Sequence, residues 1–122
     1  MATVLVDTSS CARVKLADGH GEVAEIVNRE LCGARNVLGM LRWLKPGERF
    51  EAEPLGATHQ LIYLMDGRGV LHLADHDYEV AKGAGIYLGP LETAAIRAAG
   101  GASVKLLHLI VPHIEDNAGP AK

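Results

Sequence analysis

The chain has 122 residues, the size of one domain, and its 48% hydrophobic and 22% charged residues are typical of a folded protein and exclude a disordered one. The net charge is −3 and Lys and Arg do not cluster, which argues against a nucleic-acid partner. Because no apolar run approaches the roughly 18 residues of a membrane span and no signal-peptide pattern occurs, we expect a cytoplasmic protein without a membrane partner.

Short runs of alternating apolar and polar residues follow one another along most of the chain, which predicts half-buried strands. In chain order, the predicted strands span residues 22–27, 36–44, 49–54, 58–65, 69–74, 78–80, 85–88, 93–98 and 103–111. Turn-forming Gly, Pro and Asp occupy the breaks between them. A helical turn is expected only at 29–34. The pattern therefore predicts one all-β domain, an antiparallel sandwich or barrel, that ends in a polar tail at 113–122.

Two segments resemble the two sequence motifs of the cupins. The stretch PGERFEAEPLGATHQLIYLMDGRG, residues 46–69, has the spacing of the first motif, G-x5-H-x-H-x3/4-E-x6-G. The stretch GAGIYLGPLETA, which begins at Gly83, resembles the second motif, G-x5-P-x-G-x2-H-x3-N. The resemblance covers about residues 33–112 and implies an antiparallel double-stranded β-helix, or jelly-roll barrel, preceded by an N-terminal arm over 1–32.

In cupins these motifs supply three His and one Glu that hold a metal inside the barrel. The corresponding positions here are Glu53, Leu55, Gln60 and Ala94. Leu55 and Ala94 carry no donor atom, and transition metals usually take three or more protein ligands. We therefore expect no metal cofactor at the usual place. The alternative is a divalent transition metal held by Glu53, Gln60 and His108.

Alternation along the strands indicates which side chains face the barrel interior, because residues two apart share a face. If Gln60 faces inward, then His59 points outward. On the last strand Lys105 should face water, which sends His108 into the barrel. The alternative interpretations are a core histidine bonded to a backbone carbonyl, or a parity error near a bulge. Arg42 is expected on a solvated face.

Glu53 carries the sharpest functional hypothesis. Its carboxylate would enter an apolar barrel, where burial raises the pKa of the group and suits it to general acid–base catalysis near neutral pH. Gln60 would then orient a carbonyl or hydroxyl of the substrate, and His108 would be a second proton carrier. The alternative is that Glu53 lies solvated and idle at the barrel mouth.

The replacement of two histidine positions by Leu55 and Ala94 leaves room for a small, partly apolar ligand inside the barrel. Ile62, which shares the face of Gln60, is expected to line the same space. Tyr87 would line or cap this space, or else pack in the core. The predicted substrate-binding residues are therefore Leu55, Ile62, Tyr87 and Ala94.

Three functions remain open at this point. The first is a metal-free enzyme that performs proton transfer, such as isomerisation, cyclisation, dehydration or lyase elimination, on a small metabolite. The second is a ligand-binding or sensing module without catalysis, and the third is a metal-dependent cupin with the atypical ligand set given above. The apolar N-terminal run MATVLV and the strand edges that a small barrel exposes also predict a C2 homodimer.

Overall fold

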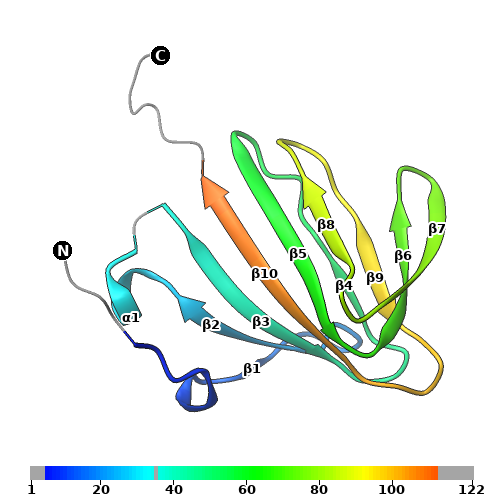
Figure 1. Cartoon of the computed structure of the whole chain (residues 1–122), viewed down its shortest axis with the longest axis horizontal. Coiled ribbons are helices and arrows are strands. Elements are labelled where there is room, and N and C mark those ends of the chain that lie inside the picture. The colour runs from blue at the N-terminus through cyan, green and yellow to red at the C-terminus, as the bar shows by residue number, and fades with distance from the viewer. Residues whose placement is uncertain (1–4, 35, 113–122) are drawn as a thin grey trace.

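The computed structural model describes residues 5–34 and 36–112, which form two antiparallel β-sheets. The strand order is β1-β2-β3-β10-β5-β8 in the larger sheet and β4-β9-β6-β7 in the smaller one. The strands are β1 Val14–Lys15, β2 Glu22–Val27, β3 Leu38–Leu44, β4 Arg49–Glu51, β5 Thr58–Asp66, β6 Arg68–Leu73, β7 His76–Ala81, β8 Gly85–Leu88, β9 Ala95–Ala98 and β10 Val104–Pro112. In Figure 1, β3, β10 and β5 run side by side as the broad front of the molecule.

All nine predicted strands are present, and the all-β jelly-roll prediction is confirmed. The single predicted helical turn is α1, Arg29–Cys32. The alternating pattern missed the two-residue strand β1 and the short helix η1 at Thr8–Ser10, because elements this short carry no measurable periodicity. Residues of the expected N-terminal arm, those of β1 and β2, join the larger sheet beside β3. The run MATVLV and the tail 113–122 lie mostly or wholly outside the described residues.

The hydrophobic core lies between the two sheets, where side chains from both inner faces meet. On β5 the side chains of Ile62 and Leu64 are buried, whereas Tyr63 between them is exposed. Strand β10 alternates in the same way, with Leu106 fully buried. This two-residue period places one face of each strand in the core, as an antiparallel sheet with one solvated face requires.

The turn between β5 and β6 depends on Gly67. Its φ angle is +91°, and a Cβ atom at this position would lie 2.1 Å from the carbonyl oxygen of Ser103. Only glycine combines the left-handed backbone with this close approach to a neighbouring chain segment. The turn therefore requires glycine at this position.

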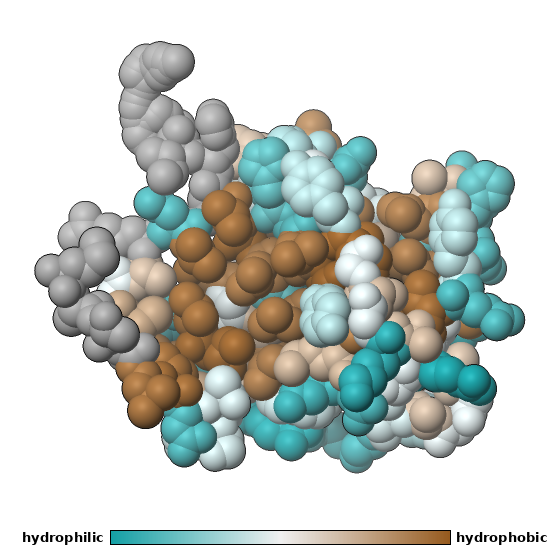
Figure 2. Space-filling view, in the orientation of Figure 1, coloured by the Kyte–Doolittle hydropathy of each residue, from teal (hydrophilic) through white to brown (hydrophobic). Residues whose placement is uncertain are grey.

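The outer face of the larger sheet carries many apolar side chains. Figure 2 shows hydrophobic side chains gathered over β3, β10 and β5 on the side that Figure 1 presents. Leu61 and Tyr63 on β5 are among the exposed ones. The homodimer expected from the N-terminal run and the strand edges remains a prediction. None of the helices in the described part of the chain has the length and apolar character needed to cross a membrane.

Candidate functional site

Three neighbouring strands place three polar side chains on the inner face of the larger sheet. Strand β10 lies between β3 and β5, and His108 is paired with Met40 on one side and Ile62 on the other. Arg42 lies two residues further along β3, opposite Leu106, and Gln60 lies opposite Ile110. Side chains at directly paired positions, and two residues from them, share one face of a sheet. Arg42, His108 and Gln60 therefore converge inside the barrel.

These three side chains form one continuous hydrogen-bonded chain. Arg42 donates from Nε to Nδ1 of His108 at 3.2 Å. A guanidinium can only donate, so Nδ1 is the unprotonated nitrogen of the ring and Nε2 carries the proton. That Nε2–H donates to Oε1 of Gln60 at 2.8 Å, and Nε2 of Gln60 donates to the backbone carbonyl of Glu53 at 2.8 Å. The chain fixes both the tautomer of His108 and the orientation of the Gln60 amide.

His108 is neutral at physiological pH. Burial lowers the pKa of the imidazole to about 4, and the positive charge of Arg42 adds to the effect. The side chain is 3% exposed, so the expectation that it enters the barrel is confirmed. Both ring nitrogens are engaged by neighbouring side chains, so the alternative of a backbone-carbonyl partner is not what the structure shows. The same bonds and the low pKa argue against the expected role as a second proton carrier.

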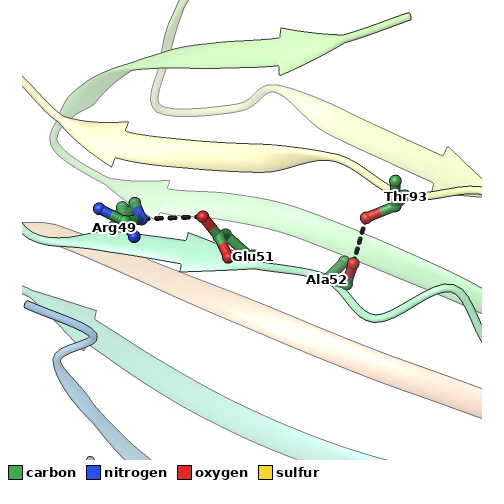
Figure 3. A network of polar contacts seen from close by, with 4 residues as sticks. All are labelled: Arg49, Glu51, Ala52 and Thr93. Carbon is green, nitrogen blue, oxygen red and sulfur yellow. Dashed lines mark hydrogen bonds and ion pairs between the residues drawn. The ribbon is translucent and has the colours of Figure 1, made fainter. Parts of the chain in front are cut away.

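Glu53 is exposed, and the expectation that its carboxylate enters the apolar interior is wrong. Phe50 and Ala52 take the buried positions of this segment, and the alternating residues Glu51 and Glu53 are exposed. Figure 3 shows how the segment is held: Thr93 donates to the carbonyl of Ala52. The alternative placement of Glu53, at the barrel mouth, is the one found.

The carboxylate of Glu51 is already paired close to the same mouth. Its Oε2 lies 2.8 Å from Nε of Arg49 on the same strand, as Figure 3 also shows. Glu53 makes no such pair with Arg49. Of the two carboxylates on this edge of the barrel, Glu53 is therefore the one with the fewer described bonds.

A cavity of about 480 Å³ lies at the barrel mouth, above the polar chain. Its wall is formed by Leu16, Ala17, His20, Val23, Glu25, Leu38, Met40, Arg42, Phe50, Glu51, Glu53, Leu55, Gln60, His108 and Ile110. All three residues predicted as catalytic, Glu53, Gln60 and His108, line this one space. The volume is that of a small-molecule site, with a mainly apolar wall and a few converging polar groups.

The predicted substrate-binding residues are separated by the structure. Leu55 lines the cavity with the polar chain. Ala94 is buried and lines a neighbouring hollow that shares Glu53, while Ile62 is packed in the core. Tyr87 is 62% exposed and points away from the barrel interior, so the expectations that it caps the ligand space or packs in the core are both wrong.

Tyr87 faces outward because it alternates with two core residues of β8, Ile86 and Leu88. On the outer face it pairs with His59, whose Nδ1 lies 2.6 Å from the Tyr87 hydroxyl oxygen. The outward direction expected for His59 is thus confirmed. The same parity rule, applied to β8, would have placed Tyr87 correctly.

Arg42 is the cavity-lining polar residue that the sequence interpretation missed. It was expected on a solvated face, but it is half-buried and lines the cavity. Its guanidinium carbon lies 4.2 Å from the centre of the Phe50 ring, a cation–π contact. The alternation along β3 indicates the inward direction of Arg42, because Leu44, two residues further on and therefore on the same face, is a fully buried core residue.

Comparison with solved structures identifies the architecture. A predicted oxalate decarboxylase from Thermotoga maritima is 20% identical, with a TM-score of 0.77 over 89% of this chain and 99% of that one. The polyketide cyclase RemF from Streptomyces resistomycificus is 16% identical, with a TM-score of 0.72 over 90% and 80%. The cupin domain of Cnp3 from Schizosaccharomyces pombe is 10% identical, with a TM-score of 0.72 over 91% and 75%.

The chain has the cupin fold. Identities of this size establish the architecture and leave the activity open. No protein-family model matches the chain, and no curated protein matches its sequence.

The cupin fold implies a metal inside the barrel, but the residues present do not fit one. Leu55 and Ala94 offer no donor atom, and both nitrogens of His108 are engaged in the polar chain. The oxygen of the Gln60 amide accepts from His108, which leaves the exposed carboxylate of Glu53 as the remaining uncommitted donor of the expected set. Across residues 5–34 and 36–112, no group of three His, Cys, Asp or Glu side chains comes together. A transition metal would therefore have to break the polar chain to gain its ligands.

Proposed function

We propose that the cavity at the barrel mouth binds a small metabolite and that the protein catalyses a proton transfer on it without a metal. The observation that carries this proposal is the preorganised chain Arg42–His108–Gln60 in the wall of a cavity of about 480 Å³. A buried polar network whose members are all bonded is rigid, and rigid polar groups in an apolar wall are what orients a ligand.

Gln60 and Glu53 have different roles in this proposal. Gln60, held at both ends of its amide, presents a fixed polar surface against which a ligand carbonyl or hydroxyl is oriented. Glu53 at the mouth is the carboxylate that takes up or delivers a proton. Carboxylates in this role serve isomerisation, cyclisation, dehydration and lyase elimination. The similarity in fold to a polyketide cyclase supports this range of reactions.

Binding is tested first, with a variant that fills the cavity. Leu55→Trp adds an indole to the cavity wall, and Leu61→Trp adds the same bulk to the exposed outer face of β5. A library of small metabolites is screened against both variants and the wild type by thermal shift and ligand-observed NMR. Ligands that bind the wild type and Leu61→Trp, but not Leu55→Trp, support the proposal. Equal binding to all three proteins would refute this location of the site.

Catalysis is tested on the ligands that bind. Each is incubated in D2O with the protein, and loss of C–H signal is followed by NMR. Glu53→Gln should abolish the exchange while binding is kept, and Glu79→Gln, an exposed carboxylate on β7, should leave it unchanged. Exchange that survives in Glu53→Gln would rule out Glu53 as the proton carrier.

A second function, ligand binding or sensing without turnover, is favoured by the exposure of Glu53. Its carboxylate lacks the apolar burial from which catalysis was expected. This function predicts tight binding that Leu55→Trp abolishes, with no exchange in D2O for any ligand that binds.

A further inference from the structure

Among the described residues that line the cavity, Arg42 supplies an inward-facing cation, its guanidinium. The side chain is held on two sides, by the hydrogen bond from Nε to His108 and by the face of the Phe50 ring. Its remaining described contact is a long one of 3.7 Å from Nη2 to the sulfur of Met40, a weak acceptor. Arg carries five N–H donors, so most of its hydrogen-bonding capacity remains for a molecule in the cavity.

The charge of Arg42 has no close partner in the described part of the chain. None of the three ion pairs found there involves this residue. His108, which touches it, is neutral, and Glu53 attracts it only at longer range. Cations that are partly removed from water are normally matched by an anion that accepts their hydrogen bonds. An anionic group that enters the cavity would supply this match.

The carboxylates at the rim decide which anion fits. Glu25, Glu51 and Glu53 line the mouth of the cavity, and all three are exposed. A phosphate with two negative charges is repelled by this rim more strongly than a carboxylate with one. A carboxylate also matches the planar fork of a guanidinium with two parallel hydrogen bonds. The apolar wall beside Arg42, with Phe50 and Leu55, suits a hydrocarbon or aromatic body.

We propose that Arg42 is the specificity-determining residue of the cavity, and that it binds the carboxylate of a small, singly charged organic acid. This inference rests on the proposed function, because it presumes that the cavity binds a ligand. The preference for an acid over its neutral analogue is a separate claim, because the cavity could bind ligands without it. The anion lies against the inner wall, and the rest of the ligand extends toward Glu53.

The test uses probes that differ only in the charged group. Benzoate, benzamide and phenyl phosphate are titrated by calorimetry and ligand-observed NMR, together with hexanoate and hexanamide. A charge-assisted bidentate contact predicts that each acid binds the wild type about 10-fold or more tighter than its amide. Phenyl phosphate should bind more weakly than benzoate. Acids and amides that bind equally, or a phosphate that binds best, would overturn the inference.

Variants locate the contact. Arg42→Gln should weaken acid binding about 10-fold or more and leave amide binding unchanged, and Arg42→Lys, which keeps the charge but not the fork, should fall between. Arg97→Gln removes an exposed arginine of β9 and should behave as the wild type. If Arg42→Gln does not fold, Arg42→Lys alone decides, since wild-type acid affinity in that variant would refute bidentate recognition. If none of the probes binds the wild type, both this inference and the proposed binding function are overturned. If acids and amides bind the wild type equally and Leu55→Trp blocks both, only this inference is refuted.

Discussion

Acid should destabilise this protein through its buried histidine His108. The pKa of His108 is lowered to about 4 in the folded protein, against about 6.5 in an unfolded chain, where the ring is solvated. The unfolded chain therefore binds the proton first as the pH falls. The stability that comes from keeping His108 neutral is complete above about pH 6.5, is lost progressively down to about pH 4, and falls no further below it.

The size of the effect follows from the two pKa values. Between about pH 7.5 and pH 5.5 the loss in unfolding free energy is about 1.4 kcal/mol, and by about pH 4.5 it reaches about 2.5 kcal/mol. Urea denaturation at these three pH values measures it in the wild type and in His108→Gln, which does not titrate. The variant should lack this part of the pH dependence, whatever its stability at neutral pH. His76→Gln, which removes an exposed histidine of β7, should keep it. Parallel pH profiles for the wild type and His108→Gln would refute the reasoning.

Three further predictions concern packing and assembly. Gln60→Leu leaves the Nε2–H of the histidine ring without its acceptor, and urea denaturation should show a loss of about 1–3 kcal/mol; an unchanged midpoint would mean that the polar chain does not exist. Gly67→Ala forces a Cβ against the Ser103 carbonyl and should lower the melting temperature far more than Gly83→Ala, where φ is also positive but no atom lies within 4 Å; equal effects would contradict the close approach. The wild type should be a homodimer in light scattering at micromolar concentration, and Tyr63→Glu on the outer face should be a folded monomer; a monomeric wild type would end the dimer prediction.

The fold was predictable because its signals are repeated along the whole chain. Alternating hydrophobicity and Gly-rich turns specify strand after strand, and an error at one boundary leaves the others intact. The inward direction of His108 followed from the same rule, applied to a nine-residue strand with a regular pattern. Long, regular strands are where side-chain parity is a dependable guide.

The site was only partly predictable because the alternation rule does not extend to Glu53 and was not applied to Arg42. Glu53 follows the end of β4, beyond the hydrogen-bonded ladder, and the motif spacing outweighed the buried pattern of Phe50 and Ala52. Arg42 was assigned by residue type, as a charged side chain in water, although its strand places it inside. Its contacts are with His108 on β10, far away in sequence, and with the Phe50 ring on β4, so no pattern within its own strand could reveal them.

The central claim is that a neutral His108, protonated on Nε2, joins Arg42 to Gln60 inside the barrel. Nitrogen-15 NMR of the imidazole rings tests it directly, because the ring shifts report both the tautomer and the protonation state. We predict one histidine that stays in the neutral Nε2–H form well below the solvated value of about 6.5, is half protonated only near pH 4, and loses its signal in His108→Gln. A His108 ring protonated on Nδ1, or one that titrates near the solvated value, would contradict the account.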